Sequence, residues 1–227
     1  MAEPLRIDIF SDVICPWCLI GRERLRQALE QLDPEQPVAI RWLPFELNPE
    51  MPREGMDRRD YAEAKFGGID QAREIYANIA EAGRAEGIEF DFSRLQRTPS
   101  TFNAHRLLWL ASSKGLGDLL KDGLFRAYFM EARDIGDLAV LTELATAAGM
   151  DADEVGQFLD SDNGEEAVRQ MESVAYQMGI TGVPFFIFNG RIGVSGAQSP
   201  EVLLQAIGRA WDPLPDEATA ESAQPDG

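Results

Sequence analysis

The sequence predicts an α/β protein in which two β-containing segments flank a long helical one. Between residues 5 and 45, two apolar strand-like runs enclose one amphipathic helix, which gives a βαβ order. Between residues 163 and 211, a helix, two short strands and a last helix give an αββα order. We therefore expect a discontinuous domain of residues 1–56 and 163–211, an all-helical insertion of residues 57–162, and a tail of residues 212–227.

The first unit is a strand, a helix and a second strand. Residues 5–10 alternate in apolar character, and residues 37–45 form a second apolar run. Between them, apolar residues recur at helical spacing from Leu25 to Leu32. This order favours a right-handed crossover between two parallel strands.

The insertion is expected to contain about five helices, because its apolar residues recur every three or four positions. The clearest of these runs are residues 69–83, 102–108, 116–129 and 138–148. No other structure is expected within it.

The closing unit carries the strongest turn signal of the chain. Asn189-Gly190 lies between two apolar runs, and this dipeptide favours a two-residue hairpin turn, which requires positive φ. Residues 165–178 before it show helical spacing. After it, Ser199 and Pro200 form a typical helix start.

Composition and charge restrict the classes of partner. Of 227 residues, 44% are apolar, so a sizeable core is expected. The 39 acidic and 21 basic residues give a net charge of −18, which argues against nucleic acid and anionic membranes as partners.

The sequence also predicts a location and a tail. No run reaches the roughly 18 apolar residues of a membrane span, and residues 1–6 lack a signal-peptide pattern, so a cytoplasmic location is expected. Residues 212–227, with five acidic residues and three prolines, are expected to be a disordered acidic tail.

The chain is organised around Cys15-Pro16-Trp17-Cys18, at the junction of the first strand and the first helix. Unpaired backbone N–H groups and the helix dipole favour a thiolate at Cys15 and lower its pKa. Pro16 suits the first helical position because it has no N–H to leave unpaired. Cys18 is close enough to attack a mixed disulfide formed at Cys15. The pattern predicts a dithiol with Cys15 as nucleophile and Cys18 as the resolving residue.

Two other interpretations of this pair are half of a zinc site and two inert thiols. A structural zinc ion takes four ligands, whereas the chain has two cysteines and one histidine. We therefore expect no metal, and the position at a helix start argues against inert thiols. Since the chain has no third cysteine, the thiol or disulfide partner must come from another molecule.

Three separate motifs resemble one known family. They are residues 11–18 around the cysteines, residues 104–107, and residues 181–198 around Val183-Pro184. The order of elements, with Cys-x-x-Cys at the first turn and Val-Pro before the hairpin, is similar to the thioredoxin fold. The helical insertion resembles that of the DsbA family. The motifs resemble its FrnE-like branch, which is related to 2-hydroxychromene-2-carboxylate isomerases and kappa-class glutathione transferases, and the resemblance covers residues 5–211.

The resemblance implies that Val183–Pro184 is a cis peptide bond packed beside the cysteines, a form tolerable essentially only before proline. It also implies that the Val183 backbone can pair with an extended peptide or with glutathione. From the residues alone, an ordinary trans proline at a strand entry is the alternative. Pro184 is expected to shape the substrate groove, with Pro16, Trp17 and Val183 lining it. Trp17 could instead cover apolar surface.

Three further candidates come from the family motifs. His105, the only histidine, is expected near the cysteine pocket, the alternative being a buried helix residue between insertion and core. Arg106 could bind an anionic substrate or form a surface ion pair. Ser195 begins the segment where relatives hold the γ-glutamyl end of glutathione, or it forms a structural turn. Several aromatic residues of the insertion are expected in the core or along the groove, namely Phe102, Trp109, Phe125, Tyr128 and Phe129.

The sequence departs from the family at two positions. Thioredoxin-type proteins carry a buried acid six residues before the first cysteine, where this chain has Ile9, and Asp8 is expected to point to the opposite face. Glu46, on the second strand, is a candidate substitute. The isomerase relatives use a serine where this chain has Cys15, which argues against isomerase activity.

The sequence thus predicts a thiol–disulfide oxidoreductase of the DsbA family acting on protein or low-molecular-weight thiols and disulfides. Such an enzyme depends on an external reductant or oxidant. No cofactor is expected apart from glutathione as a co-substrate. Two alternatives stand: a glutathione-dependent transferase or isomerase on the same scaffold, and a non-enzymatic redox-sensing or peptide-binding module. A monomer and a homodimer are both compatible with the sequence.

Overall fold

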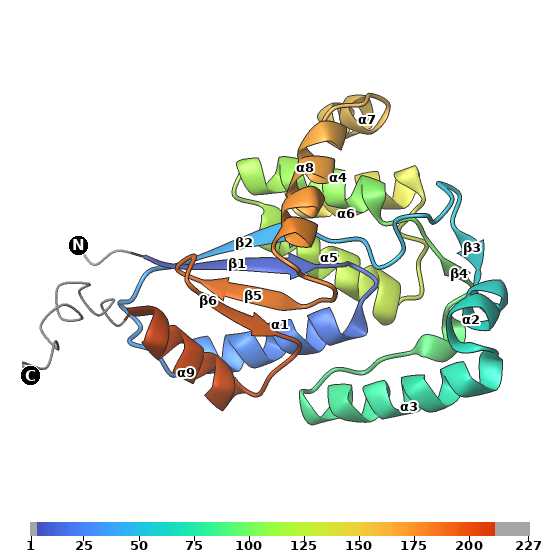
Figure 1. Cartoon of the computed structure of the whole chain (residues 1–227). Helices are drawn as coiled ribbons and strands as arrows, with labels where there is room; N and C mark the ends of the chain where they lie inside the picture. Colours follow the sequence, from blue (N-terminus) through green and yellow to red (C-terminus); the bar gives the residue numbers. More distant parts are fainter. Residues whose placement is uncertain (1–3, 212–227) are drawn as a thin grey trace, which may run out of the picture.

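A four-stranded sheet forms the centre of the protein, in the strand order β2-β1-β5-β6 (Figure 1). The computed structural model describes residues 4–211. β1 (Leu5–Ser11) is parallel to β2 (Val38–Pro44) and antiparallel to β5 (Phe185–Phe188), which pairs in turn with β6 (Ile192–Ser195). The predicted parallel pairing of the first two strands is confirmed.

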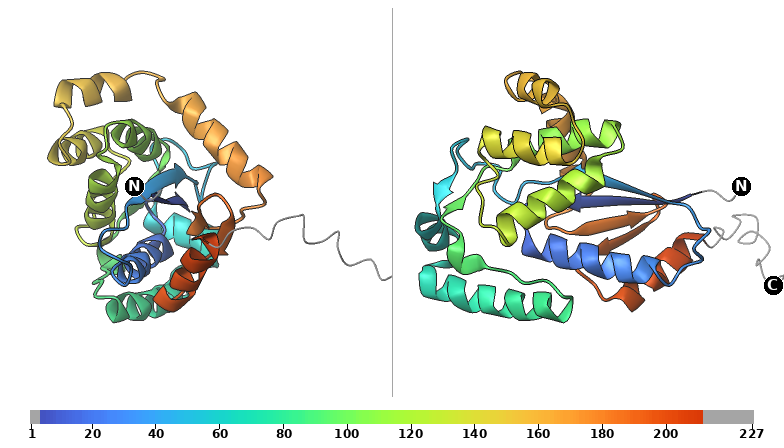
Figure 2. Two further views of the ribbon diagram at one scale, coloured as in Figure 1. Left: turned by 90° about the vertical axis from the view of Figure 1, so that its left-hand side faces the viewer. Right: turned by 180° about the vertical axis from the view of Figure 1, so that it is seen from behind.

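Two helices cover one face of this sheet. α1 (Pro16–Leu29) and α9 (Pro200–Trp211) lie side by side on it (Figure 2). Burial of their apolar stripes against the strands stabilises this layer. The shared core includes Ile7, Ile9, Leu25, Ala28, Phe186, Phe188, Leu203 and Ile207. Leu32, which the helical spacing had placed in the first helix, lies in the turn beyond Leu29.

The opposite face packs against α8 (Glu165–Gln177), where Phe10 and Ile187 of the sheet meet Ala175. This helix confirms the one predicted over residues 165–178. β2 lies at the edge of the sheet and is also in contact with helices of the insertion. The sheet is therefore covered on both faces.

Within the described residues, the insertion holds six α-helices rather than about five, and it is not all-helical. A short 3-10 turn, η1 (Phe92–Arg94), follows the second helix. β3 (Met56–Asp57) and β4 (Arg97–Thr98) pair antiparallel at its start and middle. Two-residue strands are too short to show an alternating pattern, so the all-helical prediction is wrong in this detail. The helices are α2 (Arg58–Phe66), α3 (Ile69–Ala85), α4 (Phe102–Ser113), α5 (Gly117–Phe129), α6 (Leu138–Ala147) and α7 (Ala152–Leu159).

The loop that carries the cysteines shares its core with the insertion. Val13 and Ile20 are fully buried in the same apolar cluster as residues of α4, α5 and α6. The insertion side of this cluster includes Leu107, Ala111, Leu124, Phe125 and Leu141. The division into domains stays a prediction, and the predicted tail lies outside the described residues.

The predicted hairpin is confirmed. Asn189 and Gly190 have φ values of 49° and 69°, and both are positive, as a two-residue turn requires. The last helix begins at Pro200, as expected. Over residues 4–211, no helix is both long and apolar enough to cross a membrane.

Candidate active site

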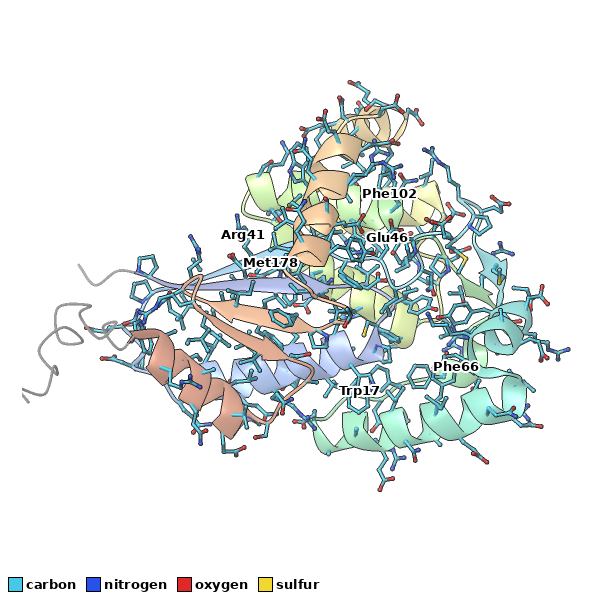
Figure 3. The ribbon with its side chains drawn as sticks, in the orientation of Figure 1. Trp17, Arg41, Glu46, Phe66, Phe102 and Met178 are labelled. Carbon is cyan, nitrogen blue, oxygen red and sulfur yellow. The ribbon has the colours of Figure 1, made fainter. Side chains whose placement is uncertain are left out.

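Cys15 lies where β1 has ended and α1 begins. It caps the helix start with extended backbone angles (φ −87°, ψ 111°), and Pro16 is the first helical residue. The Cys18 N–H donates a 3.0 Å hydrogen bond to the Cys15 carbonyl, which places Cys18 in the first turn. Trp17 is 39% exposed, and Figure 3 shows it beside the start of α1, toward α3. The predicted strand, turn and helix around the cysteines are confirmed.

The Val183–Pro184 peptide bond lies against Cys15 and is cis. The Cys15 thiol donates a hydrogen bond to the Val183 carbonyl over 3.6 Å. On the other side, the Pro184 carbonyl accepts a 2.8 Å hydrogen bond from the Gly196 N–H. Among residues 4–211 the Val183 N–H has no hydrogen-bond partner.

Gly21 allows α1 to approach this bond closely. A Cβ added at residue 21 would lie 2.9 Å from Pro184 Cγ and 3.2 Å from Phe186 Cζ, both closer than ordinary contact. The helix that carries the cysteines therefore packs directly on the strand that follows Pro184. Any larger residue at this position has to push the two apart.

Both sulfur atoms are buried, and the two thiols interact directly. Cys15 is 4% exposed and Cys18 is 1% exposed, and both are free. The hydrogen bond to Cys18, burial, and the negative charges of Cys18 and Asp12 raise the pKa of Cys15. Burial opposes ionisation of Cys18, but the hydrogen bond from Cys15, the charge of Lys121 and the Ser11 hydroxyl outweigh it and lower its pKa.

The prediction of a lowered pKa at Cys15 is thus wrong for the reduced protein. The Cys18 N–H does favour the Cys15 thiolate, but burial and two negative neighbours outweigh it. The two groups share one proton, so the charge formed first belongs to the pair. Moving that proton from Cys15 to Cys18 places the thiolate on the sulfur that lies beside the Val183 carbonyl.

Asp12 is a buried carboxylate directly before the cysteine turn. Its Oδ1 lies 3.3 Å from His105 Nε2, and its Oδ2 accepts a 2.8 Å hydrogen bond from the Leu47 N–H. Burial acts to raise the pKa of Asp12, but the interactions with His105 and Leu47 outweigh burial and lower it. Asp12 therefore carries a negative charge beside the cysteines. Sequence reasoning missed it because the expected acid was sought on the strands.

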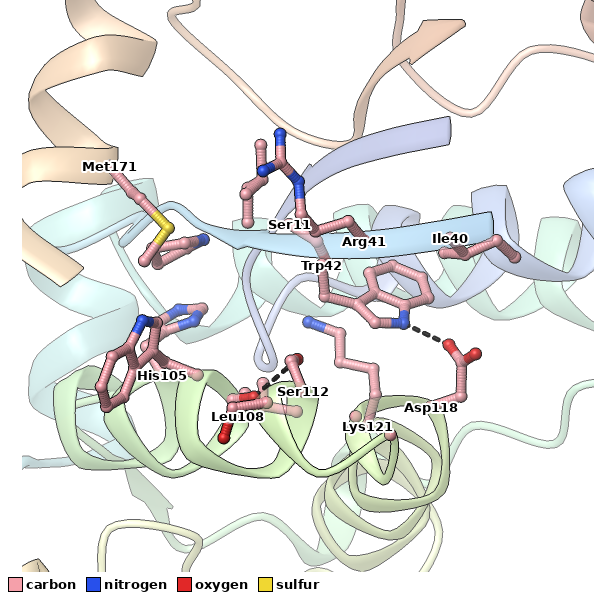
Figure 4. A pocket seen from close by; sticks show the side chains of 16 residues that line it. Ser11, Ile40, Arg41, Trp42, His105, Leu108, Ser112, Asp118, Lys121 and Met171 are labelled. Carbon is pink, nitrogen blue, oxygen red and sulfur yellow. Dashed lines mark hydrogen bonds between the residues drawn. The ribbon is translucent and has the colours of Figure 1, made fainter. Parts of the chain in front are cut away.

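Lys121 reaches the same place from α5. Its side chain is 1% exposed, and its ammonium lies 5.1 Å from the ring centroid of Trp42 and 4.8 Å from that of Phe125. Burial lowers the pKa of Lys121 to about 8, although the negative charges of Cys18 and Asp12 oppose this. The side chain lines a cavity of about 520 Å³ between β2, α4 and α5 (Figure 4). In the sequence, the burial of Lys121 is indicated only by its position as a single lysine within an apolar helical run.

Two more carboxyl groups are buried beyond Asp12. Glu46 lies two residues after β2 rather than on it, and its backbone N–H donates a 3.1 Å hydrogen bond to Glu172 Oε1 on α8. Burial, together with the charge of Glu172, raises the pKa of Glu46 to about 8. Of these groups, Asp12 is the one whose charge acts on Cys15. The role of Glu46 as the substitute acid stays a prediction.

Comparison with known families agrees with this geometry. The family model described as the DSBA-like thioredoxin domain matches residues 6–208. The chain belongs to the DsbA-like thioredoxin family. It is similar to a probable DsbA oxidoreductase from Streptomyces coelicolor, with 37% identity, a TM-score of 0.85 and coverage of 93% of each chain.

Two more distant solved structures share the DsbA-like fold. The cytosolic disulfide reductase DsbM from Pseudomonas aeruginosa is 18% identical, with a TM-score of 0.61 over 91% of this chain and 95% of that one. It has also been solved with GSH. A 2-hydroxychromene-2-carboxylate isomerase is 17% identical, with a TM-score of 0.64 over 90% of this chain and 95% of that one. The predicted DsbA family membership is confirmed, and these two neighbours show that the fold is shared.

In this DsbA-like chain, the residues predicted for the groove surround Cys15. Pro16 and Trp17 follow it in the chain, and the Val183 carbonyl contacts its sulfur. Ser195 is exposed at the end of β6, and its carbonyl accepts a 2.9 Å hydrogen bond from a side chain of the following turn. That turn is the one that contacts Pro184 through the Gly196 N–H.

His105 and Arg106 are both buried. His105 is 3% exposed, contacts Asp12 directly before the cysteine turn and lines the cavity of about 520 Å³, and its role in substrate binding stays a prediction. Arg106 is 1% exposed and donates hydrogen bonds to three backbone carbonyls of residues 158–163. Both interpretations of Arg106, a contact to an anionic substrate and a surface ion pair, are therefore wrong.

The remaining candidate residues form an ion pair or pack in the hydrophobic core, apart from the partly exposed Trp109. Asp8 points away from the cysteines, and Arg41 binds its carboxylate through two hydrogen bonds of 2.9 Å. Phe125, Tyr128 and Phe129 are buried in the core, whereas Trp109 is 39% exposed. Among residues 4–211, no group of three or more His, Cys, Asp or Glu side chains is placed to hold a metal ion.

Proposed function

We propose that the protein is a thiol–disulfide oxidoreductase in which Cys15 is the nucleophile and Cys18 the resolving residue. The observation that carries this proposal is the asymmetry of the pair. Cys15 contacts the Val183 carbonyl beside Pro184, whereas Cys18 is 1% exposed behind it. Membership of the DsbA-like family supports the same chemistry.

The reaction exchanges one disulfide for another. The Cys15 thiolate attacks one sulfur of a substrate disulfide, so that a Cys15–substrate bond forms, the substrate bond breaks, and the released thiolate takes a proton from water. The Cys18 thiolate then attacks Cys15 Sγ, and the second substrate sulfur leaves as a thiolate. The substrate gains two electrons and the cysteine pair loses two. The reverse sequence oxidises a substrate dithiol, and the relative reduction potentials set the direction.

The substrates are protein thiols and disulfides or a low-molecular-weight thiol such as glutathione. The unpaired Val183 N–H offers a hydrogen bond to an extended backbone next to Cys15. Pro16 and Trp17 provide an apolar surface on the solvent side of the same sulfur. The structure of DsbM with GSH supports a low-molecular-weight thiol as one partner. An external reductant or oxidant returns the pair to its starting state.

Two alternative functions, the cytoplasmic location and the oligomeric state stay predictions. A glutathione-dependent transferase or isomerase would need turnover without the resolving cysteine, and the likeness to the isomerase concerns the fold alone. A redox-sensing or peptide-binding module would bind its partner in one redox state without turnover. The cytoplasmic location and the oligomeric state are likewise untested.

Disulfide exchange with a peptide that carries one disulfide tests the proposal. The wild type is expected to catalyse the exchange, Cys15→Ser to be inactive, and Cys18→Ser to accumulate a mixed disulfide with the peptide without turnover. Cys15→Ser with unchanged exchange activity would contradict the proposal. Glutathione-dependent turnover by Cys18→Ser would favour the transferase, and peptide binding without turnover by the wild type would favour the binding module.

A further inference from the structure

The cavity of about 520 Å³ between β2, α4 and α5 is separate from the groove beside Cys15 (Figure 4). None of the groove residues Cys15, Trp17 and Val183 lines it. Its walls come from the edge strand β2, from α4 and from the first half of α5, and Met171 of α8 also lines it. A concave site of this size is typical of small-molecule binding. We therefore considered which ligand its walls would bind.

The walls of the cavity are largely apolar. Trp42 of β2 and Leu108 of α4 are buried residues of these walls, and Trp109 is a partly exposed one. Leu43 and Met171 extend the same apolar surface. An uncharged apolar group that enters the cavity would remove this surface from water, which is favourable.

Most polar side chains that line the cavity are already paired within the protein. They are Arg41, His105, Ser112, Ser113 and Asp118. The carboxylate of Asp118 accepts a 2.5 Å hydrogen bond from the Trp42 indole N–H, and this aspartate is exposed. These groups shape the cavity, and their hydrogen bonds do not depend on a ligand.

Two polar groups of the cavity have no hydrogen-bond partner among residues 4–211, namely the Ser11 hydroxyl and the Lys121 ammonium. Both residues are only 1% exposed. The Lys121 ammonium lies 5.1 Å from the ring centroid of Trp42 and 4.8 Å from that of Phe125. Ring faces attract a cation but accept no regular hydrogen bond from it. The ammonium therefore keeps its N–H donors for an acceptor that enters the cavity.

A carboxylate suits these two groups. It accepts hydrogen bonds from an ammonium and from a hydroxyl, and such charge-assisted bonds are strong, especially away from bulk water. A second negative charge on the ligand would meet the Asp118 carboxylate, which lines the same cavity. The net charge of −18 also disfavours polyanions. The complementary ligand is therefore a single carboxylate on an uncharged apolar body.

We propose that this cavity binds a small monocarboxylate with an apolar chain, a ligand of the short-chain fatty acid type. Lys121 and Ser11 hold the carboxylate, and Trp42 and Leu108 enclose the chain. The site goes beyond the proposed exchange function and does not depend on it, because binding involves neither cysteine. A protein without exchange activity would still bind the ligand.

Isothermal titration calorimetry with hexanoate tests the site, because two matched compounds separate the charge from the chain. Hexanamide keeps the chain without the charge, and acetate keeps the charge without most of the chain. Hexanoate is expected to bind at one site with a Kd of about 1 mM or lower. Each matched compound is expected to bind at least about tenfold more weakly. Absence of hexanoate binding, or equal affinity for hexanoate and either matched compound, overturns the proposal.

Two lysine variants test the assigned contact. Lys121→Met removes the ammonium at similar volume, so it is expected to weaken hexanoate binding about tenfold and to leave hexanamide binding unchanged. Lys114→Met makes the same change in net charge at a lysine that pairs with Glu154 at 2.8 Å and does not line the cavity. It should bind hexanoate like the wild type. An equal loss in both variants, or no loss in Lys121→Met, overturns the proposal.

The wild-type protein locates the ligand even where Lys121→Met does not fold. The chain has four tryptophans, so it gives four indole N–H signals in NMR spectra. Trp42 and Trp109 line the cavity, whereas Trp17 lies at the start of α1 beside the cysteine groove. Hexanoate is expected to shift the Trp42 and Trp109 signals and to leave the other two in place. Shifts confined to Trp17, or binding that leaves the Trp42 and Trp109 signals in place, overturn the proposal.

Discussion

Two buried carboxyl groups, those of Asp12 and Glu46, respond differently to their surroundings. His105 and the Leu47 N–H favour the charged form of Asp12 and keep its pKa low. Among the described residues, the Glu46 carboxyl has no such hydrogen-bond donor, and burial with the charge of Glu172 raises its pKa to about 8. Hydrogen bonding to the charged form, rather than burial alone, therefore decides which group is ionised at neutral pH.

Replacement of Glu46 by Gln is expected to flatten the pH dependence of stability. Glu46 ionises near its ordinary pKa of 4.5 in the unfolded chain and near 8 in the folded protein. The folded state therefore binds more protons between these values, and the free energy of unfolding falls as the pH rises through them. Glu46→Gln should remove roughly 2 kcal/mol of that fall. Urea unfolding across this pH range checks it, with exposed Glu50→Gln as the control, and an equal fall in both proteins would contradict the raised pKa.

At the scale of elements, the contact between α1 and the strand after Pro184 depends on a missing side chain. Gly21→Ala places a Cβ 2.9 Å from Pro184 Cγ, so α1 or Pro184 must shift. We expect the free energy of unfolding to fall by about 1–3 kcal/mol and disulfide exchange to slow, because the spacing of Cys15 and Val183 changes. Gly156→Ala in α7 meets nothing within 4 Å and should be neutral or gain up to about 1 kcal/mol. Equal behaviour of the two variants in urea unfolding and exchange assays would show that the close approach does not matter.

Arg106 joins α4 to the loop that follows α7. Arg106→Met removes the guanidinium that donates to the carbonyls of Phe158, Ser161 and Asn163. Among residues 4–211, the Phe158 carbonyl alone of these three keeps another partner, Ser161. The expected loss is about 2–4 kcal/mol in the free energy of unfolding, with faster hydrogen exchange confined at first to that loop. Arg73→Met removes an ion pair whose arginine is 74% exposed and should change stability little. A loss no larger than that of Arg73→Met would mean that the loop does not depend on these bonds.

Across the whole molecule, features set by neighbouring residues could be predicted from the sequence, and features set by distant residues could not. The strand, turn and helix around Cys15 follow from a local pattern, and the hairpin at Asn189 follows from the need for positive φ. β3 and β4 have two residues each, too few for any alternation, so the insertion was expected to be all-helical. The position of both cysteines at the junction of β1 and α1 could be predicted for the same reason, because their motif is continuous in the chain.

The charges around the cysteines are set by residues that are distant in the sequence, so they could not be predicted from it. Asp12 and His105 are 93 residues apart in the chain, and Glu46 and Glu172 are 126 apart. Lys121 interrupts an apolar run, where a lysine ordinarily faces solvent, and only tertiary packing buries it against the Trp42 and Phe125 rings. The helix start alone therefore gave the wrong direction for the Cys15 pKa, because the opposing burial and charges are assembled from separate segments.

The central claim is that Cys15 and Cys18 form and break one disulfide with each other. Equilibration of the wild type in glutathione buffers of graded redox ratio, with acid trapping and mass spectrometry, tests it most directly. The account predicts a single transition in which both thiols disappear together and the mass falls by two hydrogens. A stable glutathione adduct on one cysteine while the other stays a free thiol, or no reaction at any ratio, would contradict it.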